Sequence, residues 1–130
     1  DKLARARQLG VQTAIAADLP RKAYDVVVEA TGSPSGMQLA IDLVRPRGTL
    51  VLKSTYHGPL SLNAAPLVID EISLVGSRCG PFSPALAQLA GGKLKPEALI
   101  DEVFPLHAAE QALERAAQPG VLKVLLSMTV

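Results

Sequence analysis

Three short polar segments of this sequence have residue types that could contact a small ligand. They are Thr31-Gly32-Ser33, Lys53-Ser54-Thr55 and Ser77-Arg78-Cys79. Each follows an apolar run directly, so each is expected to form a loop at the end of a strand. Their small side chains would let a ligand approach the backbone closely. Taken singly, each segment could equally be an ordinary polar turn, and Cys79 a small buried hydrophobic residue.

Several other kinds of site are not supported by the residue pattern. The first segment has two glycines nearby, but it matches neither of the glycine motifs that bind nucleotide phosphates. His57, His107 and Cys79 are scattered, without the spacing of metal ligands. The G-x-S-x-G elbow of serine hydrolases is absent from the sequence, and Ser33 is better explained as a helix cap. The pattern therefore predicts neither a metal site nor a hydrolase.

The elements around the polar segments indicate a parallel sheet. Apolar runs over residues 25–30, 49–52 and 71–75 predict three strands, and the first is apolar on both faces, as if covered by helices. Between the first two, Ser33-Pro34 begins a helix with apolar residues at helical spacing. This β-α-β unit predicts parallel strands joined by a right-handed crossover. The three polar segments would then share one sheet edge and form a crevice, which suits a flat, polar heterocycle such as a nicotinamide dinucleotide better than a protein partner.

The remaining elements are predicted from helical spacing and from proline and glycine at element ends. A helix over residues 3–9 would have its N-cap at Asp1 and stop at Gly10, and a strand is expected over 13–16. Ser83-Pro84 is expected to cap a later helix. The other expected elements are helical turns over 64–69, the end of the later helix at Gly91-Gly92, an extended segment over 103–104, a helix over 107–118 that buries Ala109, Ala112, Leu113 and Ala116, and a strand over 121–127 that contains Lys123.

The composition is that of an aliphatic protein with little net charge. The 130 residues are 48% hydrophobic but only 3% aromatic, so Leu, Val, Ile and Ala must form the core. The net charge of +1, with both signs mixed along the chain, argues against a nucleic-acid or membrane-surface partner. The apolar runs are far shorter than the roughly 20 residues of a membrane span. A single cysteine cannot form an internal disulfide, which favours a cytoplasmic location.

The order of these segments resembles that of a known family. The sequence resembles the C-terminal part of medium-chain zinc-type alcohol dehydrogenases. The resemblance is nearest to the threonine and sorbitol dehydrogenase-like branch. The matching segments are DKLARARQLGV, YDVVVEATGSP, AIDLVRPRGTLVL, IDEISLVGSRCG and PLHAAEQALERAAQPGVLKVLL. The resemblance implies an α/β fold, with a partial Rossmann-like doubly wound parallel sheet in residues 1–80. A C-terminal αβ segment in residues 81–130 would follow, and would pack on a catalytic domain that this sequence lacks.

The resemblance also implies contacts with a nicotinamide cofactor, either NAD or NADP. The expected contacts are Lys2 with the adenosine ribose, Ala30, Thr31 and Gly32 along the ribose and nicotinamide, Lys53, Ser54 and Thr55 near the nicotinamide, the backbone of Ser77, Arg78 and Cys79 with its carboxamide, and Lys123 with the pyrophosphate.

Two positions depart from the pattern of the family. Many relatives have glycine where this sequence has Arg47, and Val-Gly where it has Lys53-Ser54. A lysine near the nicotinamide would either change the local charge or point away from the ring. The zinc ligands, the proton relay and the Gly-rich pyrophosphate loop of the family lie N-terminal to the matching part. No catalytic residue and no zinc ligand is therefore expected in this sequence.

The implied function is that of the cofactor-binding part of an NAD(P)-dependent, zinc-dependent alcohol or polyol dehydrogenase, in which hydride passes from the alcohol to the nicotinamide. The parent enzyme would be a cytoplasmic homo-oligomer whose partners are the cofactor and an alcohol substrate. Two alternatives remain open: a zinc-free quinone reductase of the same superfamily, and a non-enzymatic nucleotide-binding or structural module. Alone, the chain is expected to bind cofactor weakly, to show little or no activity and to expose apolar surface.

Overall fold

The computed structural model describes residues 2–56, 58–92 and 94–128, and the chain forms two compact units. One unit comprises residues 14–80, and the other combines residues 1–13 with residues 81–130. The expected N-cap at Asp1 and the side chain of His57 lie outside the described residues.

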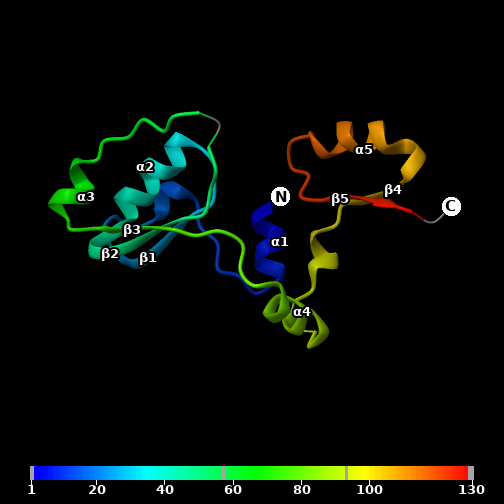
Figure 1. The fold of residues 1–130 in the computed structure, drawn as a ribbon, viewed down its shortest axis with the longest axis horizontal. Helices are drawn as coiled ribbons and strands as arrows, with labels where there is room; N and C mark the ends of the chain where they lie inside the picture. Colours follow the sequence, from blue (N-terminus) through cyan, green and yellow to red (C-terminus); the bar gives the residue numbers. More distant parts are fainter. Residues whose placement is uncertain (1, 57, 93, 129–130) are drawn as a thin grey trace. The chain divides into compact units, whose positions relative to one another are not determined.

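A parallel three-stranded sheet forms the centre of the unit of residues 14–80 (Figure 1). Its strands, in spatial order, are β1 (Tyr24–Glu29), β2 (Val44–Leu52) and β3 (Ser73–Gly76). The connections are α2 (Pro34–Leu43) between β1 and β2, and α3 (Ala65–Ile69) between β2 and β3, and a short 3-10 helix, η1 (Ala16–Asp18), precedes the sheet. Both strand pairs are parallel, which confirms the predicted β-α-β unit.

Helix α2 begins where the local sequence signals predict. Ser33 is its N-cap, and the Ser33 hydroxyl accepts a hydrogen bond of 3.1 Å from the amide of Gly36, while Pro34 occupies the first turn. The apolar side of α2 packs on the sheet, and each large side chain buried there contributes about 2 kcal/mol. The buried core consists of Met37, Ala40, Ile41, Val44, Leu50 and Ile72. The expected aliphatic core thus lies between α2 and the sheet (Figure 1).

The opposite face of the same sheet is exposed. Val26 and Val28 point away from α2, because side chains alternate along a strand, and they are 58% and 57% exposed. Val75, which shares this face two strands away, is 47% exposed. The prediction that β1 is covered on both faces is therefore wrong for the described residues, since α2 covers only one face. These valines supply exposed apolar surface of the kind expected of the chain alone.

Arg47 in β2 has a strained backbone conformation. Its φ of 61° falls in the left-handed region, which costs a residue with a Cβ roughly 1–2 kcal/mol. Its guanidinium group forms an ion pair with Glu71 over 3.0 Å, but the two side chains are 78% and 66% exposed. Such an exposed pair contributes little stability. The position that carries glycine in many relatives is thus one where glycine fits better.

We expect Arg47→Gly to raise the free energy of unfolding by roughly 1 kcal/mol, because glycine relieves the backbone strain. Urea denaturation measures the change. Arg45→Gly, two residues earlier and without a positive φ, is the control, and it should lower stability, because glycine there relieves no strain and loses more conformational freedom on folding. An unchanged or lower stability of Arg47→Gly would contradict this account of the strand.

The unit of residues 1–13 and 81–130 contains a second parallel pair of strands. Its first helix, α1 (Lys2–Gln8), ends before Gly10, as predicted, and Gly10 has a φ of 79°. The later elements are α4 (Phe82–Ala90), η2 (Pro96–Leu99), β4 (Glu102–Pro105), η3 (Leu106–Ala108), α5 (Ala109–Ala116) and β5 (Val124–Ser127). β4 and β5 are parallel, and α5 joins them and packs on both. This is a second β-α-β unit.

Three details of the predicted elements are wrong. Residues 13–16 pair with no strand among the described residues, and Ile15 is 55% exposed. The expected strand therefore has no hydrogen-bonded partner strand and is not packed into the core. Ser83 lies inside α4 and does not cap it, because the helix begins one residue earlier. Leu113 is 71% exposed and Ala116 is exposed too, so of the residues expected to face inward from this helix only Ala112 is buried. Each error concerns a property that depends on packing partners.

Candidate functional site

The loops that follow β1, β2 and β3 leave the sheet side by side. The register pairs Glu29 with Leu52, and Leu52 with Gly76, so the three strands end next to one another. Since the strands are parallel, all three predicted polar segments start at the carboxyl edge of the sheet. Open α/β sheets bind their ligands at this edge.

The second and third loops line one hollow of about 560 Å³. This volume lies in the range of small-molecule sites. The lining residues are Lys53, Ser54, Thr55, Gly76, Ser77, Arg78 and Cys79. Cys79 is exposed, so the alternative of a buried hydrophobic cysteine is wrong. The structure therefore brings the predicted residues of these two loops together around one space.

The first loop is attached to the second by a hydrogen bond. The amide of Gly32 donates to Ser54 Oγ over 2.8 Å. Gly32 has a φ of 68°, which favours glycine, and a Cβ built there would meet nothing within 4 Å. Ala30, Thr31 and Gly32 are all exposed. A ligand at the edge of the sheet could therefore lie directly against this loop.

Glu29, which no sequence pattern singled out, is the last residue of β1 and lies between these two loops. It is 2% exposed and is the one buried charged residue of the described part of the chain. Its Oε1 accepts hydrogen bonds from the amide and from the hydroxyl of Thr31, each 2.6 Å long. Its Oε2 accepts a third, also 2.6 Å long, from the hydroxyl of Tyr56. The carboxylate thus connects the loop after β1 to the loop after β2.

These hydrogen bonds keep Glu29 charged. Burial by itself would raise the pKa of this carboxyl group, but hydrogen bonds from the Thr31 hydroxyl, Tyr56, the Thr31 amide and Ser54 outweigh it and lower the pKa to about 2. The pKa of Tyr56 moves the other way: burial, the hydrogen bond to Glu29 and the negative charge of Glu29 raise it to about 12. Near neutral pH the pair is a carboxylate and a neutral phenol.

Part of this arrangement had a signal in the sequence. A carboxylate at the end of an apolar strand needs hydrogen-bond partners, and Thr31 follows at the spacing of a local side-chain turn. Tyr56 gave no such signal, because it lies 27 residues further along the chain. Gly36 was also missed. A Cβ on Gly36 would lie 1.8 Å from Thr31 Oγ1, so the absent side chain makes room for Thr31.

Lys53, one of the two departures from the family pattern, contacts the third loop. Its Nζ donates a hydrogen bond to the backbone carbonyl of Arg78. Lys53 also lines the hollow, so its ammonium group places a positive charge in the wall of that space. The second and third loops are thereby linked, as the first and second are linked through Glu29.

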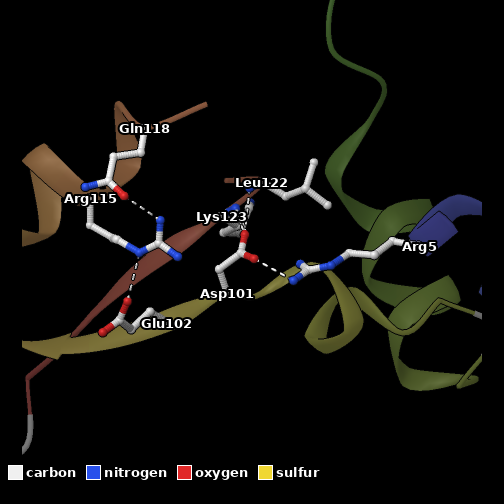
Figure 2. Close-up of polar contacts among 7 residues, drawn as sticks. All are labelled: Arg5, Asp101, Glu102, Arg115, Gln118, Leu122 and Lys123. Carbon is white, nitrogen blue, oxygen red and sulfur yellow. Dashed lines mark hydrogen bonds and ion pairs between the residues drawn. The ribbon is translucent and has the colours of Figure 1, made fainter. Parts of the chain in front are cut away.

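Lys2 and Lys123, the other predicted cofactor residues, belong to the unit that contains α1 and β5. Both are exposed. Lys123 lies immediately before β5, and the prediction that it sits inside a strand is wrong. Figure 2 shows the reason: Asp101 Oδ2 accepts hydrogen bonds from the amides of Leu122 and Lys123, over 2.6 and 3.1 Å, which occupies these amides before the ladder begins.

Asp101 joins three segments of that unit (Figure 2). In addition to the two amides, its Oδ1 forms an ion pair of 2.6 Å with Arg5 of α1. The pKa of Asp101 is lowered below its usual range, mainly by the hydrogen bonds from the amides of Leu122 and Lys123. Burial acts in the opposite direction, and Arg5 adds to the lowering. The contacts of Asp101 are all with its own unit, so this cluster is explained by the fold and does not indicate a ligand.

The described residues include no group of three or more His, Cys, Asp or Glu that could hold a metal ion. They therefore offer no site that fits zinc. The exposed first loop and the hollow beside it do fit a flat ring, because the loop is open at Gly32 and small side chains form part of the lining of the hollow. Within the same described part, no helix has the length and apolar character needed to cross a membrane.

Several proteins of related sequence are dehydrogenases by name. A family profile described as zinc-binding dehydrogenase matches residues 1–91. D-arabinitol dehydrogenase 1 of Uromyces fabae is 34% identical over 105 residues, which are 78% of this chain and 30% of that protein. Sorbitol dehydrogenase of Mus musculus is 30% identical over 104 residues, or 78% of this chain and 29% of that protein. The chain thus spans about 30% of the length of these curated relatives.

Solved structures have a similar fold. L-idonate 5-dehydrogenase from Escherichia coli str. K-12 substr. MG1655 aligns with a TM-score of 0.75 and 28% identity, over 86% of this chain and 33% of that one. Alcohol dehydrogenase TADH from Thermus sp. ATN1 aligns with a TM-score of 0.81 and 25% identity, over 95% of this chain and 40% of that one. These matches confirm the predicted α/β, Rossmann-like fold.

Proposed function

Because the chain belongs to the zinc-binding dehydrogenase family, as the resemblance implied, we propose that it is the cofactor-binding part of an NAD(P)-dependent alcohol or polyol dehydrogenase. One observation carries the proposal: the loops after three parallel strands start at one sheet edge, where the second and third line a hollow of about 560 Å³ and the first is attached to the second. When bound there, the nicotinamide ring would accept a hydride from the alcohol carbon. The residues of this chain would hold and orient that ring.

Each loop has its own task in this proposal. Residues 30–32 lie along the ribose and the nicotinamide, because this loop is exposed and open at Gly32. Ser54 and Thr55 contact the ring region from the second loop. The backbone of residues 77–79 holds the carboxamide from the third loop. Lys53 adds a positive charge to the same wall.

Four further assignments remain predictions. Lys2 would contact the adenosine ribose, and Lys123 the pyrophosphate. Residues 1–80 would form the nucleotide-binding portion and residues 81–130 the segment that packs on a catalytic domain. The parent enzyme would be a cytoplasmic homo-oligomer.

We propose a polyhydroxylated alcohol as the substrate. Two relatives are named for polyols, arabinitol and sorbitol. The described residues hold no metal-ligand cluster, so any zinc that polarises the alcohol would be bound elsewhere in a longer protein. The chain spans about 30% of its curated relatives, which leaves room for such a domain.

Titration of NADH into the chain, followed by NADH fluorescence, tests this proposal. We expect a Kd of about 1 mM, or about −4 kcal/mol, because the chain supplies only one wall of the cofactor site. ADP-ribose lacks the nicotinamide and should bind several-fold more weakly, since most of the proposed contacts lie at that end. With NAD and sorbitol or arabinitol we expect no turnover. No response at millimolar NADH would overturn the proposal, and sub-micromolar binding with turnover would show that the chain is a complete enzyme.

A further inference from the structure

The backbone amides of the loop after β1 are occupied within the protein. Three successive amides donate hydrogen bonds to side chains. The amide of Thr31 donates to the carboxylate of Glu29 (2.6 Å), the amide of Gly32 to the hydroxyl of Ser54 (2.8 Å) and the amide of Ser33 to Thr31 Oγ1 (3.2 Å). Anion sites in such loops use successive N–H groups that are free to point at the ligand. This loop offers none of the three. It therefore contacts a ligand through its shape and not through these three N–H groups.

The position of this loop depends on Glu29. One carboxylate oxygen receives two hydrogen bonds from Thr31, and the other receives one from Tyr56 of the next loop. Their length of 2.6 Å is that of charge-assisted hydrogen bonds, which are the strong ones. None of the ion pairs among the described residues includes Glu29. Its negative charge is therefore stabilised by hydroxyl and amide donors of the two loops.

We propose that Glu29 is a positioning residue for the nicotinamide end of the cofactor, and that its hydrogen bond with Tyr56, beside the bond between Gly32 and Ser54, fixes the separation of the loops after β1 and β2. This rests on the proposed function, in which the cofactor lies against both loops. A ligand bound by shape is sensitive to that separation, because a gap of about 0.5–1 Å already removes a large part of the contact energy. Tyr56 therefore affects the cofactor without touching it.

Tyr56→Phe tests the proposal, because it removes the hydroxyl and keeps the ring. Tyr24→Phe, at the only other tyrosine, is the matched control. In Tyr56→Phe without ligand, the amide hydrogens of Thr31 and Gly32 should exchange faster than in the wild type. The initial slope of the NADH fluorescence titration should fall about fivefold, which corresponds to the loss of one typical hydrogen bond. The loss for ADP-ribose, followed by competition, should be smaller, because ADP-ribose keeps the ribose but lacks the nicotinamide, and Tyr24→Phe should change none of these values.

The outcomes separate this proposal from the proposed function. Wild-type exchange rates at Thr31 and Gly32 in Tyr56→Phe would show that the hydroxyl does not hold the loop, and would overturn the proposal. Equal losses for NADH and ADP-ribose would reveal a general loss of structure and would overturn it as well. If the wild-type chain does not respond to NADH, the proposed function fails and the cofactor role of Glu29 fails with it. Faster exchange would then still support the link between the loops.

Discussion

Replacing Gly36 with alanine is expected to destabilise the unit of residues 14–80 by about 1–3 kcal/mol, although alanine normally favours a helix by up to about 1 kcal/mol. The added Cβ would lie 1.8 Å from Thr31 Oγ1, 2.7 Å from Thr31 Cβ and 2.8 Å from Thr31 Cγ2. A rotation of the Thr31 side chain cannot relieve the clash, because Cβ does not move with χ1. The backbone of the first loop must shift, and its hydrogen bonds to Glu29 must weaken.

Urea denaturation of Gly36→Ala measures this effect, and the sign of the change is decisive. Gly80→Ala is a suitable control, since a Cβ on Gly80 would meet nothing within 4 Å and the residue has no positive φ. It should leave stability nearly unchanged. The response to NADH should also fall in Gly36→Ala, because Thr31 lies in the proposed cofactor loop. A stabilised Gly36→Ala would mean that helix propensity outweighs the clash, and the described packing of Thr31 would be wrong.

The second large effect is a loss of stability in acid that comes from Glu29. The pKa of this carboxyl group is lowered from 4.5 to about 2 in the folded chain, so its contribution to stability is complete above about pH 4.5. As the pH falls from there through about 2, the unfolded chain takes up the proton first and the contribution disappears. The size of the shift corresponds to about 3 kcal/mol.

Urea denaturation between pH 6 and pH 2 measures this dependence in the wild type and in Glu29→Gln. The variant should be less stable at pH 6 and should lose less stability on acidification, because glutamine does not titrate. Asp25→Asn is the control: this carboxylate is 79% exposed and forms a surface ion pair with Arg45, so the substitution should cost little stability at pH 6. Parallel profiles for the wild type and Glu29→Gln would show that Glu29 is not held as a charged group.

The elements that could be predicted are those with short-range signals. Ser33 and Pro34 mark the start of α2 within a few residues, and the helical spacing of Met37 and Ile41 identifies its buried side. The parallel order of β1, β2 and β3 follows from a helix between strands, and it places three loops at one edge before any distance is known. The position of the candidate site was therefore within reach of sequence reasoning.

The features that could not be predicted depend on partners that are distant in the sequence. The buried carboxylate of Glu29 has one of its hydrogen-bond donors in Tyr56, which lies 27 residues away. Val26 and Val28 are apolar, as in a strand that is covered on both faces. Their exposure nevertheless depends on whether a second layer of helices covers the sheet. Lys123 lies outside β5 because Asp101, earlier in the chain, accepts a hydrogen bond from its amide. Periodicity reports which side chains prefer burial, but not which contacts are available.

The most direct test of the central claim is a map of NADH contacts by NMR, with ¹⁵N-labelled chain and millimolar NADH. Our account predicts shifts concentrated at the amides of residues 30–32, 54–55 and 77–79. The amide of Thr31 should shift through its surroundings while its hydrogen bond to Glu29 is retained. The same spectra also report on a second possible binding region, an apolar hollow lined in part by Leu89, Leu94 and Leu99. Shifts confined to that hollow, or no shifts at all, would contradict the assignment of the sheet edge as the cofactor site.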